Sequence, residues 1–298
     1  MNGIINVYKE KGMTSHDVVY AVRRILKTKK VGHAGTLDPE AEGVLVVGVG
    51  KGTRLLEYVG DGYKVYEGEI VFGLNSDTED IHGELEPVEF SSELLEDSRL
   101  EKVINSLTGT IISQKPPMYS SVKVKGRKLY QYARAGIEVD RPTKNIEIKS
   151  LSLKDKLYFE GDYWRARFIA GVSKGTYIRT LCVHIGSLLG IPAVMGSLTR
   201  VQIGHFFLDT SLKIGALAEL ETKGDRSFLL PVREAIVDQM LQVELDDDSY
   251  SKIKLGQKIK NIFHIDNGVI FAGIYKEELV CILKNEDSIL RIIKNVGV

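Results

Sequence analysis

Residues 32–49 read GHAGTLDPEAEGVLVVGV and join a polar, glycine-bounded loop to an apolar strand. Gly43–Val49 is rich in β-branched side chains, which is typical of a buried strand. Pro39 disfavours helical geometry at Asp38 and favours an extended backbone there. Gly35 and the glycine that opens the strand allow tight turns on either side. The stretch therefore predicts a rigid loop that presents the Asp38 carboxylate for nucleophilic or acid–base chemistry. It is also compatible with an aspartate that merely opens a turn before proline, which is common in proteins.

Segments on both sides of this loop alternate between strand and helix patterns without regular βαβ repetition, which predicts an α+β sheet domain. Residues 29–42 are expected to form a loop throughout. Thr14 and Asp17 form a capping box that starts a helix. The strands expected in the first 210 residues are Ile4–Tyr8, Gly43–Val49, Lys64–Phe72, Ser120–Val124, Asn145–Leu153, Trp164–Val172 and Ser197–Phe207. The other expected helices are Thr53–Val59, Ser92–Leu107, Lys128–Ala135 and Gly175–Leu189.

The pattern changes after Pro231. Short apolar strands, separated by Asp-Asn-Gly and Lys-Asn-Glu turn signals, then follow one another. They are expected at Val269–Tyr275, Leu279–Leu283 and Ile289–Ile293. We therefore predict two domains, a larger one over residues 1–238 and a small β-barrel over residues 239–298.

Composition places the chain among globular proteins. It has 298 residues, of which 43% are hydrophobic. No stretch approaches the roughly 18 apolar residues of a membrane span, and the N-terminus lacks the pattern of a secretory signal. Cys182 and Cys281 lie far apart and are expected to be reduced, buried thiols. The sequence thus predicts a soluble cytoplasmic protein without a membrane partner.

The net charge is zero, with 40 basic and 40 acidic residues, but the charges are segregated along the chain. Residues 113–136 and 163–207 contain no acidic residue. A third basic cluster follows the first helix, at Arg23, Arg24, Lys27, Lys29 and Lys30. Such zones are compatible with ordinary solvated faces and also with a basic face that binds nucleic acid.

Several common chemistries are not supported. Residues 48–53, GVGKGT, lack the serine or threonine that follows lysine in a phosphate-binding loop, and they lack the third glycine of a dinucleotide site. The six histidines show no paired helical spacing, so no metal site is predicted. A Gly-x-Ser-x-Gly nucleophile elbow is absent from the sequence. The residues thus give no indication of a cofactor.

The stretch GHAGTLDP, followed by Gly-Val-Leu at 43–45, resembles the catalytic motif of the bacterial tRNA pseudouridine-55 synthase family. The resemblance extends over nearly the whole chain. It includes Lys9 with residues 12–17 (GMTSHD), 64–66 (KVY), 77–83 (DTEDIHG), 116–123 (PPMYSSVK), 126–136, 175–179 (GTYIR) and 198–200 (LTR). Two positions depart from the family pattern: Glu10 stands where proline is usual, and Ser121 stands where alanine is usual.

The resemblance implies isomerisation of uridine 55 in the T-loop of tRNA to pseudouridine, without a cofactor. It implies a pseudouridine synthase fold, α+β with a mixed, largely antiparallel central sheet and flanking helices. The C-terminal β domain would be PUA-like and bind RNA, and the tRNA T-arm would be the partner of a monomeric enzyme. The resemblance also implies roles for seven residues: Asp38 as the catalytic carboxylate, Tyr66 stacked on the target uracil, Arg179 paired with Asp38, Tyr177 and Leu198 lining the base pocket, His33 contacting RNA, and Lys9 supporting the first motif.

The chemistry agrees with this resemblance. The target nucleotide must leave a folded loop, at a cost of a few kcal/mol, and stacking on an aromatic ring returns roughly 1–3 kcal/mol. Attack at uracil C6, attack at sugar C1′ and elimination from the sugar all remain open. Two other functions remain open as well: a non-catalytic RNA-folding factor, and a glycoside hydrolase that pairs Asp38 with Glu40 or Glu42.

Overall fold

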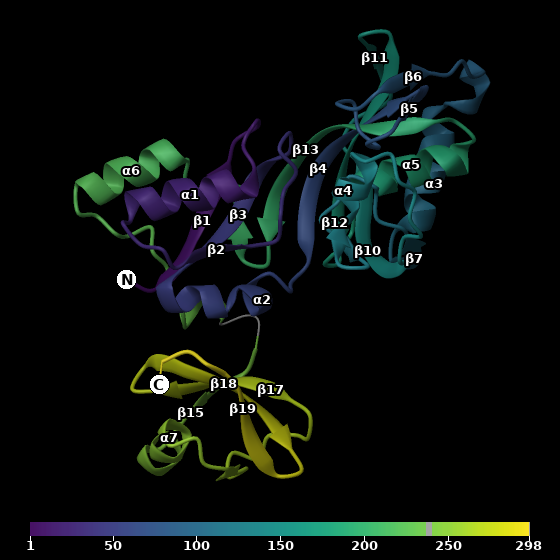
Figure 1. Ribbon diagram of the computed structural model, residues 1–298. Helices are drawn as coiled ribbons and strands as arrows, with labels where there is room; N and C mark the ends of the chain where they lie inside the picture. Colours follow the sequence, from purple (N-terminus) through teal and green to yellow (C-terminus); the bar gives the residue numbers. More distant parts are fainter. Residues whose placement is uncertain (237–239, 298) are drawn as a thin grey trace. The chain divides into compact units, whose positions relative to one another are not determined.

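The computed structural model describes residues 1–236 and 240–297, which form two compact units (Figure 1). One unit comprises residues 1–62 and 203–298, and the other comprises residues 63–202. The expected boundary between residues 238 and 239 lies outside the described residues. No helix among the described residues is long and apolar enough to span a membrane.

The first unit is built on an antiparallel pair of strands, β1 and β3. Strand β2 pairs antiparallel with residues 46–49, at the C-terminal end of β3. Helices α1 and α6 lie side by side in Figure 1 and share a core cluster with this pair through Ile5, Val18 and Leu217. The elements are β1 (Gly3–Lys9), α1 (Ser15–Ile25), β2 (Val31–Ala34), β3 (Glu42–Val49), η1 (Gly50–Arg54), α2 (Leu56–Val59), β14 (Phe206–Phe207), η3 (Leu208–Thr210), α6 (Ile214–Thr222) and η4 (Glu234–Ile236).

Residues 242–295 contain a five-stranded sheet that curls into a half-barrel, in the order β15-β17-β18-β19-β16. Strands β15 and β17 are parallel, and the other neighbours are antiparallel. The elements are β15 (Gln242–Glu244), α7 (Asp247–Lys254), β16 (Ile259–Lys260), β17 (Ile270–Tyr275), β18 (Glu278–Glu286) and β19 (Ile289–Asn295). The expected C-terminal run of β-strands is therefore present.

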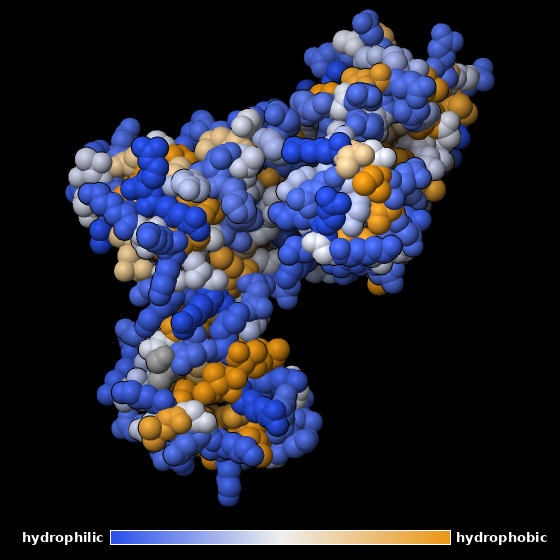
Figure 2. Space-filling model, viewed as in Figure 1, coloured by the Kyte–Doolittle hydropathy of each residue, from blue (hydrophilic) through white to orange (hydrophobic). Residues whose placement is uncertain are grey.

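Apolar surface remains on this C-terminal sheet. Figure 2 shows hydrophobic residues gathered on the part of the molecule that is yellow in Figure 1. Within residues 240–297, the large apolar side chains that are exposed are Leu241, Leu255, Ile262, Val269, Ile270 and Ile293. Cys281, by contrast, is buried inside this part of the chain. Its burial raises the pKa of the thiol to about 12.

The second unit is a sheet in the order β13-β4-β12-β10-β7, with the hairpin strand β11 added to β12. The β4/β12, β12/β10 and β10/β7 pairs are antiparallel. Helices α3 and α5 pack against this sheet and against each other. The elements are β4 (Lys64–Phe72), β5 (Leu74–Ser76), β6 (Leu85–Pro87), η2 (Ser92–Leu94), α3 (Asp97–Leu107), β7 (Thr110–Gln114), β8 (Lys123–Val124), β9 (Arg127–Lys128), α4 (Leu129–Ala133), β10 (Lys144–Leu153), β11 (Tyr158–Glu160), β12 (Tyr163–Val172), α5 (Ile178–Leu189) and β13 (Ala193–Ile203).

The α+β class and the largely antiparallel sheet are confirmed, but several boundaries differ from the sequence-based prediction. The loop expected over residues 29–42 contains strand β2, because Val31–Ala34 pairs with β3. The helix expected from Ser92 begins at Asp97. Of the strand expected over 120–124, only its last two residues are extended, in a short hairpin with Arg127–Lys128. Strand β7 and helix α6 were not predicted.

Candidate active site

The Asp38 loop, residues 35–41, is a tight turn whose backbone carbonyls bind a buried lysine. The φ angles are +86° at Gly35 and +104° at Gly43, which confirms that glycine is needed at both ends. The backbone N–H of Ala41 donates to the carbonyl of Asp38 at 3.2 Å. Lys9, at the end of β1, has no exposed surface. Its ammonium donates to the carbonyls of Pro39 at 2.9 Å and Ala41 at 2.5 Å.

A buried ammonium is stable only when its protons are hydrogen-bonded. Lys9 therefore requires this loop conformation, and the loop requires Lys9. A third bond, to the carbonyl of Glu10 at 3.1 Å, completes this set of donations. Asp38 itself is half-buried. The lysine thus fixes the backbone on the C-terminal side of Asp38.

The N-terminal side of the loop is fixed by helix α1. The hydroxyl of Ser15 donates to the carbonyl of Leu37 at 3.1 Å and accepts from its N–H at 2.9 Å. His33 lies on β2, where its ring meets that of His16 edge-on with centroids 5.8 Å apart. The structure therefore brings Lys9, His33 and Asp38 into one neighbourhood of the first unit.

Tyr66 belongs to the second unit, where β4 pairs it with Ala170 of β12. Its ring is buried, and the guanidinium of Arg200 lies 5.9 Å from the ring centroid and 3.5 Å from the hydroxyl. Arg200 is only 1% exposed. Leu198 is two residues earlier on β13 and thus shares a strand face with Arg200. Arg200 therefore contacts Tyr66, and Leu198 lies on the same face of β13 as Arg200.

Sequence reasoning placed Arg200 only within a basic zone and a matched motif, and it missed the contact with Tyr66. The only signal in the sequence was its spacing of two from Leu198 on a strand. The partner strand, β4, lies more than a hundred residues earlier, so the contact is set by the order of the sheet. A buried guanidinium over an aromatic ring is a cation–π contact, which would orient the ring of Tyr66.

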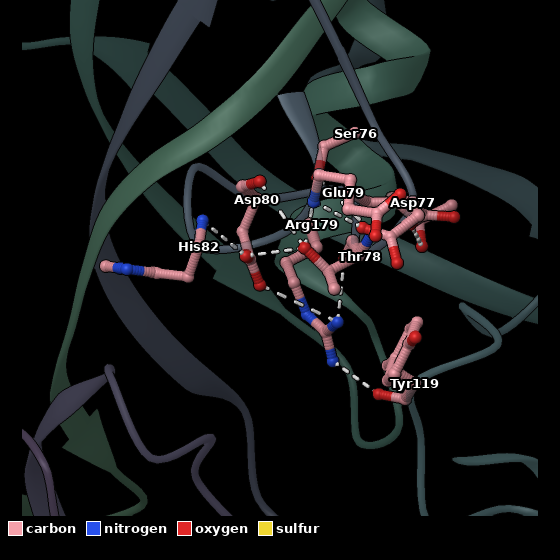
Figure 3. Close-up of polar contacts among 10 residues, drawn as sticks. Ser76, Asp77, Thr78, Glu79, Asp80, His82, Tyr119 and Arg179 are labelled. Atoms are coloured by element: carbon pink, nitrogen blue, oxygen red, sulfur yellow. Dashed lines mark hydrogen bonds and ion pairs between the residues drawn. The ribbon is translucent and has the colours of Figure 1, made fainter. Parts of the chain in front are cut away.

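Arg179 lies in the first turn of α5 and is 4% exposed (Figure 3). Its guanidinium donates to the carbonyl of Thr78 at 2.8 Å and to that of Tyr119 at 2.9 Å. The carboxylate of Asp80 lies 3.8 Å from the same guanidinium. Asp80 also accepts from the hydroxyl of Thr78 at 2.7 Å. Arg179 is thus held in a fixed orientation by residues 78–80 and by the segment that contains Tyr119.

Tyr177 is the N-cap of α5, and the side-chain amide of Gln114 holds it from both sides. The N–H of Tyr177 donates to Gln114 Oε1 at 2.8 Å, and Gln114 Nε2 donates to the carbonyl of Tyr177 at 3.0 Å. Tyr177 lines a largely apolar cavity of about 300 Å³ together with Pro116, Val122 and Lys144. This cavity is large enough for a flat aromatic group of the size of a nucleobase.

The sequence-predicted residues therefore fall into two sets. Lys9, His33 and Asp38 lie in the first unit, and Tyr66, Tyr177, Arg179 and Leu198 lie in the second. Each set is ordered by buried polar contacts of its own. Among the described residues, no group of three or more histidine, cysteine, aspartate or glutamate side chains is placed to hold a metal ion.

Comparison with solved structures identifies the fold. A chain of a Cbf5–Nop10–Gar1 complex matches with a TM-score of 0.72 and 26% identity, covering 96% of this chain and 79% of that one. A chain of an H/ACA RNP bound to a substrate RNA containing 2′-deoxyuridine has the same fold, with a TM-score of 0.72 and 22% identity, covering 99% of this chain and 84% of that one.

The family models give the class. The model for the "TruB family pseudouridylate synthase (N terminal domain)" matches residues 23–178, and that for the "tRNA pseudouridylate synthase B C-terminal domain" matches residues 179–237. The fold and these matches define a pseudouridine synthase, which is an isomerase.

Full-length relatives agree with the family models. The tRNA pseudouridine synthase B of Streptococcus sanguinis (strain SK36) is 45% identical over 97% of each chain. That of Listeria innocua serovar 6a is 44% identical over 95% of this chain and 93% of its own. The chain belongs to the TruB family of pseudouridylate synthases.

Proposed function

We propose that this enzyme converts uridine 55 in the T-loop of tRNA to pseudouridine, with Asp38 as the catalytic carboxylate. The names of its full-length relatives support tRNA as the substrate. The T-arm is the partner we propose for a monomeric, cytoplasmic enzyme. Within the chain, residues 1–238 would carry the reaction, and the PUA-like residues 239–298 would add RNA contacts.

The reaction is balanced without an external reagent. The glycosidic bond between C1′ and N1 breaks, and a bond between C1′ and C5 forms. The hydrogen on C5 leaves as a proton, and N1 gains one. Because nothing is oxidised and no group is transferred from outside, a carboxylate, a proton acceptor and a shaped base pocket are sufficient.

The proposed roles follow from the resemblance residue by residue. Asp38 acts on the everted uridine, and Arg179 pairs with Asp38. Tyr66 stacks on the uracil and accepts a proton in the isomerisation. The base pocket is lined by Tyr177 and Leu198, while His33 contacts the RNA at the place that the nucleotide has left and Lys9 supports the Asp38 loop.

The observation that carries the proposal is the burial of Lys9 beneath the Asp38 loop. Two of its three donations go to the residues at positions 39 and 41, directly after the carboxylate. Holding a reactive group in a fixed geometry lowers the entropy cost of the reaction. An RNA-folding factor has no use for such a fixed carboxylate, so this arrangement favours an enzyme.

The experiment uses tRNA transcript that carries tritium at C5 of uridine. Wild-type protein is expected to release the tritium from one position per tRNA, and Asp38→Asn is expected to release none while still binding tRNA. Glu40→Gln, which changes an exposed carboxylate of the same loop, is the matched control and should retain activity.

Each alternative gives a different result in this assay. Equal release by wild type and Asp38→Asn would remove Asp38 from the mechanism. Binding without release by the wild type would indicate a folding factor. Cleavage of the sugar–base bond with loss of free uracil, and loss of activity in Glu40→Gln or Glu42→Gln, would indicate a hydrolase. A transcript with cytidine at position 55 tests the choice of nucleotide and should release nothing.

A further inference from the structure

Glu79 has an unusual backbone conformation for its residue type. Its φ angle is +64°, in the left-handed region that non-glycine residues adopt at a cost of roughly 1–2 kcal/mol. Such strain persists where the surrounding structure requires it, and it gathers at functional sites. Main-chain bonds hold Glu79 in place: its carbonyl accepts from the N–H of Met195 at 3.1 Å.

The side chain of Glu79 binds the helix that carries Arg179. Its Oε2 accepts from the hydroxyl of Thr180 at 2.5 Å. Thr180 follows Arg179 directly in the first turn of α5. On the loop side, Thr78 and Asp80, the residues on either side of Glu79, contact the guanidinium of Arg179. Three consecutive loop residues therefore hold two consecutive helix residues. Figure 3 shows the contacts of Thr78 and Asp80 with Arg179.

We propose that Glu79 is a positioning residue for Arg179, acting through its bond to Thr180. The bond fixes the start of α5 against residues 78–80, so that the guanidinium meets Thr78 and Asp80 in one orientation. The left-handed backbone at Glu79 turns its side chain toward Thr180 while its neighbours face Arg179. This inference rests on the proposed function, in which Arg179 acts on the reaction through Asp38.

The charges around Glu79 agree with a clamp that depends on ionisation. Burial raises the pKa of the Glu79 carboxyl above its ordinary value, while the Thr180 hydroxyl and the charges of Arg179 and Arg141 act in the opposite direction. The carboxylate of Asp80 adds to the rise. Cys182, which faces Glu79 from α5, is buried and its thiol pKa is raised, so it remains neutral. Protonation in moderately acidic solution should therefore weaken the clamp.

The test is a double-mutant cycle on kcat for tritium release. Glu79→Ala and Thr180→Val are each expected to lower kcat about tenfold. KM for tRNA should be unchanged, because a residue that acts through Arg179 adds no binding contact of its own. The double variant should be no slower than either single variant, since all three lack the same bond. Thr180→Ser keeps the hydroxyl and should restore most of the activity. Exposed Glu101→Ala and Thr222→Val are the matched controls.

Two further variants of Glu79 distinguish the contribution of its side chain from that of its backbone conformation, and the contribution of its charge from that of its size. Asn accepts the left-handed conformation more readily than Glu, but its side chain is one methylene shorter. Glu79→Asn is therefore expected to be as slow as Glu79→Ala. In the wild type, kcat should fall in acid partly because Glu79 is protonated. Glu79→Gln cannot be protonated there, so this part of the pH dependence should be absent from it. A wild-type kcat in Glu79→Asn would overturn the proposal, and so would additive losses of kcat in the double-mutant cycle. It would also be overturned if kcat among the variants fell in proportion to the midpoint of urea denaturation, because the loss would then reflect stability alone.

A readout without substrate separates this inference from the proposed function. Hydrogen exchange in the first two turns of α5 should be faster in Glu79→Ala and in Thr180→Val than in the wild type or Glu101→Ala. Unchanged exchange would contradict the clamp, whatever the activity. If exchange is faster in the two variants but the wild type releases no tritium from tRNA, the result would support the clamp and contradict the proposed function.

Discussion

At the scale of single residues, the site depends on cations that are buried and held by hydrogen bonds. Lys9, Arg179 and Arg200 are each at most 4% exposed. Burying a charge is expensive unless its protons are satisfied, so each of these side chains requires its neighbours in one arrangement. Lys9 holds backbone carbonyls, Arg179 holds the 78–80 loop, and Arg200 lies over the ring of Tyr66.

The first prediction at this scale concerns Lys9. Lys9→Met keeps the length of the side chain and removes the donor from three carbonyls. Each buried polar group that loses its partner costs about 1–3 kcal/mol. We expect the free energy of unfolding, measured by urea denaturation, to fall by at least ~2 kcal/mol, and kcat for tritium release to fall further than the loss of folded protein explains.

Lys11→Met is the matched control, because Lys11 lies two residues away and is exposed. It should change the free energy of unfolding by no more than about 0.5 kcal/mol. A Lys9→Met protein with wild-type stability and activity would show that the Asp38 loop holds its conformation without the buried ammonium.

At the scale of elements, local signals determined where α1 begins. Thr14 is its N-cap, and the capping box with Asp17 forms as the sequence predicts. The hydroxyl of Thr14 accepts from the N–H of Asp17 at 3.1 Å, and the Asp17 carboxylate accepts from the N–H of Thr14 at 2.8 Å. The first turn of this helix also carries Ser15, which binds the Asp38 loop through Leu37. The cap therefore supports the site indirectly.

Removal of this cap gives a pH-dependent prediction. Thr14→Ala should lower the free energy of unfolding by about 1 kcal/mol at neutral pH. Hydrogen bonds from Thr14 lower the pKa of Asp17. A lowered folded-state pKa stabilises the fold above the unfolded pKa, and this contribution is lost as pH falls through the folded pKa. The difference between the two proteins should shrink in acid, measured by urea denaturation at several pH values.

Asp17→Asn provides the comparison, because it removes only the ionisable half of the capping box. Its stability relative to the wild type should recover in acid, when the wild-type carboxyl is itself protonated. A difference between Thr14→Ala and the wild type that stays constant down to strongly acidic pH would show that the bond to Asp17 does not depend on its charge.

Other elements were decided by pairing that no local pattern reveals. Val31–Ala34 is too short to show an alternating pattern and is extended because it pairs antiparallel with residues 46–49 of β3. Thr110–Gln114 alternates exposed and buried side chains over only five residues and is stabilised by β10. Lys252 and Lys254, which alternate like residues of a solvated strand, lie on helix α7.

At the scale of the whole molecule, the basic zones read from the sequence are only partly surface. In the acid-free stretch 163–207, Arg179 and Arg200 are buried, and Arg165 forms an ion pair with Glu69 at 2.6 Å. In the other stretch, 113–136, cations remain exposed, among them Lys123 and Arg127. The basic surface available to RNA is therefore smaller than the count of cations implies.

Salt dependence tests this surface. Because phosphate contacts release counterions, the affinity for tRNA should fall steeply as salt rises. Lys123→Ala combined with Arg127→Ala should weaken binding and reduce the slope of log K against log salt by about 2. Lys102→Ala, at an exposed position on α3, should leave the slope unchanged. A flat salt profile for the wild type would contradict a basic RNA-binding face.

Local residue patterns were enough to predict the α+β class, the strand that follows the Asp38 loop, the glycine turns beside that loop and the cap of α1. These features depend on interactions between residues a few positions apart, which leave a pattern in the chain. The sequence did not reveal the contact of Arg200 with Tyr66, the binding of Lys9 to the carbonyls of Pro39 and Ala41, or the bond between Glu79 and Thr180. Those contacts join residues 30 to 134 positions apart. Only tertiary structure decides them, because a buried charge takes whichever partners the packed sheet and helices place beside it.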